Sequence, residues 1–283
     1  MCRWLAYSGT PILPMELLYK PEHSLIDQSR HARMGVETTN GDGFGLGWYA
    51  EPGDPDQWDG QPALFRGTSP AWSDVNLREL SGRIHTGLFF AHIRASTGSP
   101  VQQTNCHPFR HGRWMWMHNG AIAHFAELHR ELLLAVDPSL YPSIQGSTDS
   151  ELMFYLSLTL GLEHDPVHAV ERMIGLVEQT ADKHGIPDAM QMTVATSDGV
   201  RTWGFRYSTS RRSRSLFYST DVNTLRRLHP DFAELREVSE DTRIVVSEPL
   251  GPLSGAWQAV PESSYGVVQP GDDEIHPLVP RAA

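Results

Sequence analysis

Large hydrophobic side chains are grouped in short segments, separated by polar residues, glycine and proline, and this pattern is typical of β-strands. The first such segment begins almost at the first residue of the chain. We expect strands over residues 2–7, 40–49, 87–96, 113–118, 190–196, 202–207, 216–219 and 242–247.

The middle of the chain shows helical spacing instead. Apolar residues recur three and seven positions apart over 125–132, and at i, i+3, i+4 and i+7 over 170–177, where Gly185 is expected to end the helix. Residues 148–151 (TDSE) have the spacing of a capping box and precede an almost continuous apolar run at 152–162, which predicts a buried helix. Strands toward both ends with helices between them favour a layered α+β architecture over alternating βαβ units.

The chain has 283 residues, and no internal repeat or linker-like segment divides it. We therefore expect one domain over residues 2–260. Residues 261–283 are rich in proline and acidic side chains, a composition that predicts a surface tail.

The charge balance excludes several classes of partner. Lysine and arginine number 23 against 34 acidic residues, a formal net charge of −11, which repels phosphate backbones and anionic lipid surfaces. Two cysteines exclude a disulfide framework and fit a reducing compartment. Because no apolar run is long enough for a membrane helix, we expect a soluble, cytoplasmic protein without nucleic-acid or membrane partners.

Cys2 directly follows the initiator methionine. Its small side chain permits removal of Met1, which would leave an α-amine and a thiol on the same residue. The amine has an ordinary pKa of about 7.7–8.0, so near neutral pH it can accept the thiol proton, through a bridging water. The alternative is that a cysteine without a role stands at position 2.

Six short segments occur in a characteristic order: 1–3 (MCR), 40–45 (NGDGFG), 92–98 (HIRASTG), 105–108 (NCHP), 119–120 (NG) and 148–151 (TDSE). Together they resemble the class II glutamine amidotransferases, a family of N-terminal-nucleophile hydrolases. The resemblance covers about residues 2–250. It is strongest to stand-alone members similar to the ergothioneine-pathway γ-glutamyl amidohydrolase and the glutathione-degrading amidotransferase-like proteins, through residues 40–45 and 246–250 (VSEPL). It implies a four-layer αββα sandwich with mainly antiparallel sheets.

The resemblance also implies the reacting groups. Cys2 would attack the side-chain amide of a γ-glutamyl group, while Asn119 and Gly120 would form the oxyanion hole through an amide side chain and a backbone N–H. An Asn-Gly pair is also a strong hairpin signal, so a turn that ends the strand from residue 113 is an alternative for this segment.

Four further residues match substrate-binding positions of the family. Arg94 would bind the α-carboxylate with its guanidinium fork, Asp149 would bind the α-ammonium group, and Thr97 and His107 would line the pocket. The alternatives are an ion-pairing surface arginine, an aspartate favoured by a helix dipole, and a histidine in an ordinary loop. Gly98 stands where hexosamine-forming relatives carry histidine, so we expect a more open pocket on that side.

Glycine occupies every second position from 41 to 47, so one face of this predicted strand has no side chains. A neighbouring backbone or helix, or else the substrate, is expected to lie against it. The sequence contains no H-E-x-x-H, paired C-x-x-C or phosphate-binding glycine-lysine motif, and we expect neither a metal nor a cofactor. We expect Cys106 to be a small buried side chain.

These observations predict an enzyme that hydrolyses a γ-glutamyl amide, of glutamine or of another γ-glutamyl compound, through a Cys2 thioester. After Gly251 we expect too little chain for a synthetase domain. One alternative is therefore a glutaminase that delivers ammonia to a separate synthase or amidase subunit. Another is a regulatory subunit that binds γ-glutamyl compounds without catalysis.

Overall fold

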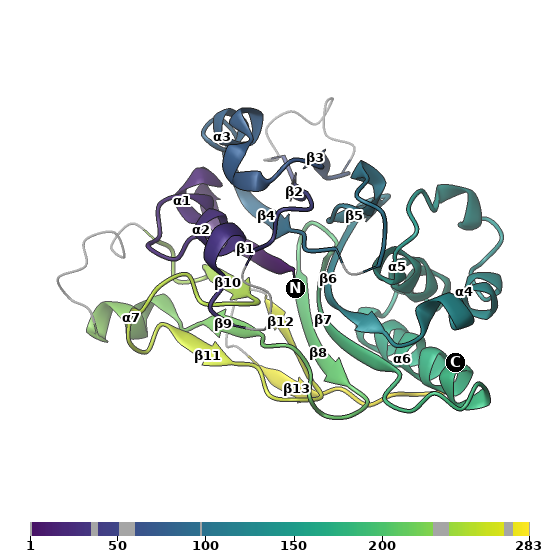
Figure 1. Cartoon of the computed structure of the whole chain (residues 1–283). Coiled ribbons are helices and arrows are strands. Elements are labelled where there is room, and N and C mark those ends of the chain that lie inside the picture. Colours follow the sequence, from purple (N-terminus) through teal and green to yellow (C-terminus); the bar gives the residue numbers. More distant parts are fainter. Residues whose placement is uncertain are drawn as a thin grey trace.

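The computed structural model describes residues 2–34, 39–50, 60–96, 98–228, 238–268 and 274–282. Within these residues, two antiparallel sheets form the centre of the molecule (Figure 1). Sheet A has the strand order β11-β9-β10-β1-β4-β2-β3, and sheet B has the order β13-β12-β8-β7-β6-β5.

The strands of sheet A are β1 (Arg3–Ile12), β2 (Phe44–Trp48), β3 (Ala63–Gly67), β4 (Thr86–Ile93), β9 (Phe217–Ser219), β10 (Arg243–Val246) and β11 (Trp257–Ala259). Those of sheet B are β5 (Phe109–His111), β6 (Trp114–Ile122), β7 (Met190–Ser197), β8 (Thr202–Ser208), β12 (Ser264–Val268) and β13 (Ile275–Pro277). The helices are α1 (Met15–Leu18), α2 (Leu25–His31), α3 (Val75–Ser81), α4 (Phe125–Leu134), α5 (Asp149–Thr159), α6 (Pro166–Lys183) and α7 (Val222–Leu228), with short 3₁₀ turns at Ala71–Ser73, Gln103–Asn105 and Tyr141–Ser143.

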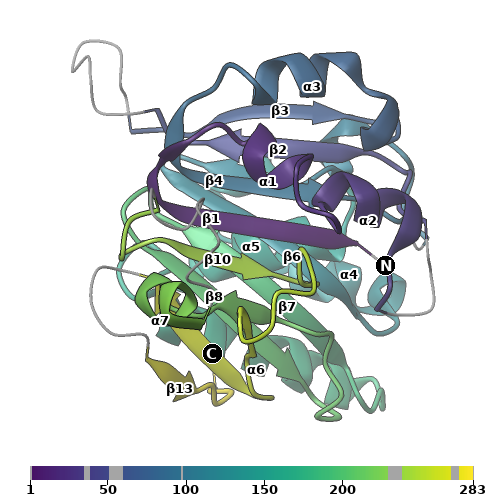
Figure 2. The same cartoon turned by 90° about the vertical axis from the view of Figure 1, so that its left-hand side faces the viewer.

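Three apolar clusters hold these elements in four layers. Trp4 of β1, Phe90 of β4 and Met117 of β6 belong to the cluster between the two sheets. A second cluster joins sheet B to α4, α5 and α6, and a third joins sheet A to α1, α2 and α3. Figure 2 shows α1–α3 in front of β3, β2, β4 and β1. The predicted αββα sandwich with antiparallel sheets is therefore confirmed.

Strand β4 packs against helices on one face of sheet A and against sheet B on the other, and its side chains alternate between these two faces. Phe89, Ala91 and Ile93 point to the cluster on the helix side, whereas Phe90 points to the other sheet. Helix α5 is buried on nearly all sides, as its continuous apolar run predicts. Thr148 caps it by accepting the Glu151 N–H at 3.2 Å. The capping box is only half formed, because the Glu151 carboxylate instead accepts from the N–H groups of residues 145 and 146.

Asn119 and Gly120 lie inside β6, paired with Thr193 and Met192 of β7. The hairpin-turn alternative for this pair is therefore wrong. Glycine is required for a close approach: a Cβ at Gly120 would lie 1.9 Å from the Gln191 carbonyl oxygen.

Residues near the C-terminus extend sheet B. The composition of residues 261–283 predicts a surface tail, yet β12 pairs with β8 and β13 pairs with β12. Tyr265 and Val267 pack against the cluster under sheet B, and Leu278 is buried in it. The abundance of proline and acidic residues in this segment pointed to a tail, and the short alternating pattern of β12 was therefore not recognised as a strand. No helix among the described residues is long and apolar enough to cross a membrane.

The side-chain-free face of β2 is covered by the segment that contains Cys106, His107 and Pro108. A Cβ at Gly45 would lie 1.9 Å from the His107 carbonyl oxygen, and a Cβ at Gly47 would lie 2.7 Å from Pro108 Cγ. A neighbouring backbone or helix, or else the substrate, was expected against this face, and the structure places a neighbouring backbone there. The glycines let this segment, and with it His107, come close to sheet A.

This contact predicts the effect of a single methyl group. Gly45→Ala should lower the free energy of unfolding by about 1–3 kcal/mol, because the segment at His107 must shift to make room. Gly204→Ala in β8 is the matched control, since its Cβ would come no closer than 3.6 Å to Val245 Cγ1. Urea unfolding of both variants measures the difference. An equal effect of the two substitutions would contradict the packing described here.

Candidate active site

A cavity of about 630 Å³ opens where β1 begins and β4 ends, next to β6 and the start of α5. Five of the seven predicted catalytic and substrate-binding residues line it: Cys2, Arg94, His107, Gly120 and Asp149. Asn119 is only 5% exposed and is not among the lining residues, although it adjoins Gly120 in β6. Thr97 lies outside the described residues.

Cys2 enters the cavity from the start of β1. It is half-buried, and its thiol lies 3.6 Å from the carbonyl oxygen of Ala95. Burial raises the pKa of the Cys2 thiol, although the contact with Ala95 and the positive charges of Arg94 and Arg3 oppose this effect. The resting side chain is therefore a neutral thiol at neutral pH, and it needs a base to react as a nucleophile.

Arg94 follows β4 and is 3% exposed, which excludes an ordinary surface arginine. Its guanidinium donates to Ser99 Oγ at 2.7 Å, to Ser96 Oγ at 3.2 Å and to the Asp42 carbonyl oxygen at 3.4 Å. These partners are all uncharged oxygen atoms. Hydroxyl and carbonyl groups thus hold the guanidinium in place at the cavity, where its planar fork suits a carboxylate ligand.

Asp149 is the first residue of α5. One carboxylate oxygen accepts the N–H of Ile122 at 2.9 Å, and the other accepts the N–H and the hydroxyl of Ser150 at 2.7 and 3.1 Å. The helix dipole favours an acid at this position, and the carboxylate also lines the cavity. The helix dipole therefore accounts for an acid here, and the role of Asp149 in binding an α-ammonium group stays a prediction.

Three buried histidines lie around the cavity. The rings of His92 and His107 are 4.1 Å apart, and His118 approaches Ser150 Oγ through Nδ1 at 2.8 Å. Burial lowers the pKa of His92 to about 3 and lowers that of His107 well below its usual range. Burial also lowers the pKa of His118, with Asp149 acting in the opposite direction. All three rings are therefore neutral at neutral pH.

His107 and His118 both line the cavity. Among the described residues, neither nitrogen of the His107 ring has a hydrogen-bond partner, and His118 Nε2 has none. These ring nitrogens are shielded from solvent, and their hydrogen-bonding capacity is unused in the described structure. Sequence reasoning missed His118, although its place two residues before Gly120 on the same face of β6 was a usable signal.

Gly98 lines the cavity with a φ of +87°, a backbone conformation that favours glycine. No atom lies within 4 Å of the position that a Cβ would take there. This side of the cavity is open, as expected.

Cys106 is buried, and its Sγ lies 3.3 Å from the Gly67 carbonyl oxygen. Burial raises the pKa of its thiol, and it is not among the residues that line the cavity. Cys2 is therefore the cysteine that faces a ligand-sized space. Over the described part of the chain, no group of three or more His, Cys, Asp or Glu side chains is arranged to hold a metal ion.

The two antiparallel sheets between helical layers define an N-terminal-nucleophile-hydrolase-like fold. The glutamine phosphoribosylpyrophosphate amidotransferase of B. subtilis shares it, with a TM-score of 0.64, 13% identity, and coverage of 99% of this chain and 50% of that one. The family profile of the class-II glutamine amidotransferases matches residues 21–279, and the chain belongs to this family of amidotransferase-type hydrolases.

Individual relatives agree with this assignment. The probable glutamine amidotransferase DUG3 of Saccharomyces cerevisiae is 34% identical over 99% of this chain and 85% of the yeast protein. The γ-glutamyl-hercynylcysteine sulfoxide hydrolase of Mycolicibacterium smegmatis is 25% identical over 75% of this chain and 83% of that protein. A class-II glutamine aminotransferase domain protein from Silicibacter pomeroyi matches with a TM-score of 0.72 and 30% identity, over 99% of this chain and 100% of that one.

The buried histidines predict a loss of stability in mild acid. In the unfolded chain a histidine has a pKa of about 6.5. Folded His92 has a pKa of about 3. Below pH 6.5 the unfolded chain binds a proton that the folded one does not, so the free energy of unfolding falls as the pH falls. Each such histidine contributes a slope of up to about 1.4 kcal/mol per pH unit.

Urea unfolding between pH 7.5 and 5 measures this slope. His92→Phe should flatten it, while the same substitution at the exposed His85 serves as the control. If His92→Phe leaves the slope as steep as in the wild type, the buried His92 is not a neutral ring that gains a proton on unfolding.

Proposed function

We propose that the chain hydrolyses a γ-glutamyl amide through a thioester on Cys2 and releases glutamate. What supports this proposal most directly is the one cavity that Cys2, Arg94 and Asp149 line together. A γ-glutamyl group carries one carboxylate, one ammonium and one reacting carbonyl. Among its described lining residues, the cavity offers one arginine, one acidic side chain and one thiol.

The two charged side chains would bind the ends of the glutamyl group. Arg94 would take the α-carboxylate on its guanidinium fork, and Asp149 would take the α-ammonium group. Hydrogen bonds already hold both side chains in place, so little side-chain entropy is lost on binding. His107 and His118 would complete the polar lining as neutral hydrogen-bonding groups.

The chemistry would begin after removal of Met1. The free α-amine of Cys2 would take the thiol proton through a water, and the thiolate would attack the γ-carbonyl carbon. The N–H of Gly120 and the amide of Asn119 would stabilise the resulting oxyanion. As the C–N bond breaks, the ammonium would give its proton to the leaving amine. A water, deprotonated by the same amine, would then cleave the thioester.

The size of the cavity favours a leaving group larger than ammonia. Its volume of about 630 Å³ falls within the range of about 300–1,000 Å³ that accommodates drug-sized ligands, which are much larger than glutamine. The open side at Gly98 adds to this space. One relative is named as a γ-glutamyl-hercynylcysteine sulfoxide hydrolase, whose named substrate is a γ-glutamyl compound other than glutamine. We therefore extend the proposal to γ-glutamyl compounds other than glutamine.

Substitution of the two cysteines tests the proposal. Glutamate release should be measured from glutamine, glutathione and other γ-glutamyl amides. Cys2→Ala should abolish release from all of them, because no other thiol faces the cavity, whereas Cys106→Ala should retain it. A diazo-ketone analogue of glutamine should label only Cys2, and only in molecules that have lost Met1.

Three results would each contradict this function. One is undiminished glutamate release by Cys2→Ala. Another is labelling of Cys106 in place of Cys2. The last is ligand binding without glutamate release in protein that has lost Met1, which would instead favour a regulatory subunit.

A further inference from the structure

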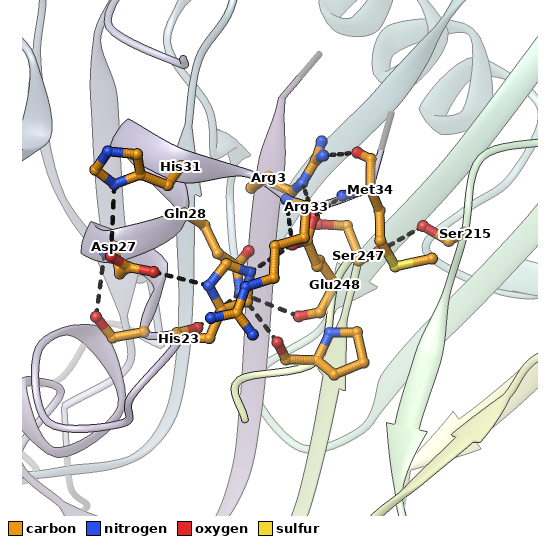
Figure 3. Close-up of polar contacts among 12 residues, drawn as sticks. Arg3, His23, Asp27, Gln28, His31, Arg33, Met34, Ser215, Ser247 and Glu248 are labelled. Atoms are coloured by element: carbon orange, nitrogen blue, oxygen red, sulfur yellow. Dashed lines mark hydrogen bonds and ion pairs between the residues drawn. The ribbon is translucent and has the colours of Figure 1, made fainter. Parts of the chain in front are cut away.

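Glu248 is a buried carboxylate that follows β10, and four donors converge on it (Figure 3). Arg3 Nε lies 2.7 Å from Oε2, and His23 Nε2 lies 2.5 Å from Oε1. The backbone N–H groups of Arg33 and Met34 donate at 2.8 and 3.0 Å. A carboxylate has about four lone-pair sites, so every acceptor position of this side chain, which is 2% exposed, is used.

The charge of this carboxylate is retained. Burial by itself raises the pKa of Glu248, but the hydrogen bonds from His23, Arg33 and Arg3 outweigh it, and the pKa lies below its usual range. Glu248 is therefore ionised at neutral pH and forms a buried ion pair with Arg3.

Arg3 connects Glu248 to the predicted nucleophile. Its Nη1 donates to the carbonyl oxygen of Cys2 at 3.0 Å, and its Nη2 donates to the carbonyl oxygen of Met34. Because the guanidinium is planar and rigid, the position of Glu248 is transmitted to the Cys2 peptide group. Next to it, the N–H of Trp4 donates to Ser247 Oγ at 2.9 Å. The segment after β10 thus holds the first residues of the chain.

His23 ties the same carboxylate to α2. Its Nδ1 lies 2.8 Å from Asp27 Oδ2, so each ring nitrogen faces a carboxylate oxygen. Gln28 adds hydrogen bonds to the carbonyl oxygens of His23 and Glu248, at 3.0 and 3.3 Å. Figure 3 shows these side chains gathered around Glu248.

A nucleophile at a chain terminus needs such a restraint. Terminal residues are poorly ordered unless they are tied down. A misplacement of about 1 Å can cost roughly 100-fold in rate, because reaction requires a near-attack geometry. Once Met1 is removed, no preceding residue would hold Cys2. The contacts made by Arg3 and by β1 would then fix the direction in which the thiol and the amine enter the cavity.

We propose that Glu248 is the positioning residue for Cys2: it fixes Arg3, and Arg3 fixes the peptide group of the nucleophile. This inference rests on the proposed role of Cys2. The proposal also gives a function to residues 246–250. This segment resembles the family, but the resemblance alone assigned no role to it. Glu248 does not touch the substrate, so its effect is on geometry.

Glu248→Gln tests this role, since it keeps the size of the side chain and removes its charge. Glu171→Gln is the matched control, because Glu171 is also buried and bonded to an arginine, Arg281, but lies in α6. Both proteins are assayed well below their unfolding midpoints. We expect kcat for glutamate release to fall about 10- to 100-fold in Glu248→Gln with little change in KM. Glu171→Gln should keep the wild-type kcat.

The reactivity of Cys2 toward a maleimide gives a second readout that needs no turnover. A loosened terminus should react severalfold faster than in the wild type, while the diazo-ketone analogue should react more slowly. Buried Cys106 serves as the internal reference in the same mass spectrum. A substitution that only destabilises the fold would change neither rate in the folded protein.

Arg3→Lys is the second variant, in case Glu248→Gln fails to fold. It keeps the positive charge beside Glu248 but lacks the fork that reaches Cys2, so it should show the same loss of kcat and the same gain in maleimide reactivity. Combining the two substitutions should cost no more than the larger single effect.

The proposal is overturned if Glu248→Gln, or Arg3→Lys in its place, lowers only the unfolding midpoint and otherwise behaves as Glu171→Gln does. Independent, multiplying losses in the double variant would overturn it as well. If even the wild type released no glutamate, the proposed function would fail, but the maleimide rates would still decide whether Glu248 positions Cys2.

Discussion

Strand β1 pairs with β4 on one side and with β10 on the other, and this pairing decides what lies around Cys2. Arg3 stands opposite Ile93 in β4. Because the strands are antiparallel, Cys2, which precedes Arg3, lies toward Arg94, which follows Ile93. Leu5 stands opposite Val246 in β10, and continuing that register brings Arg3 beside Glu248. A shift of one residue in either pairing would separate the thiol from the guanidinium or from its restraint.

The cavity combines fixed charges with neutral rings. Hydroxyl, carbonyl and N–H groups take the place of water around the Arg94 guanidinium and the Asp149 carboxylate, and hold both side chains in place. The histidines nearby are neutral because burial makes a charged ring costly, and a further positive charge beside Arg94 would be repelled. The glycines of β2 make this arrangement possible, since they let the His107 segment pack directly on the sheet.

Local patterns predicted much of the fold. The alternation in β4, the buried run of α5 and the side-chain-free face of β2 each follow from the order of residues along one segment. The resemblance identified five of the residues that line the cavity. Asn119 is not among them, and its role in an oxyanion hole stays a proposal.

What the sequence did not predict arises from contacts between distant segments. The strands β12 and β13 lie in a proline- and acid-rich segment whose composition suggested a tail. His118 lines the cavity where β6 meets the start of α5, and its ring contacts Ser150, 32 residues further along the chain. The role proposed for Glu248 depends on β10 lying beside β1, more than 200 residues away in the chain.

A covalent intermediate on Cys2 is the most direct consequence of this account. Protein that has lost Met1 is mixed with a γ-glutamyl amide, quenched in acid within one turnover and analysed by peptide mass spectrometry. The account predicts a glutamyl adduct on the peptide that begins with Cys2, removed by hydroxylamine as a thioester is. Glutamate release with no adduct on Cys2 at any quench time, or with an adduct on another residue, would contradict it.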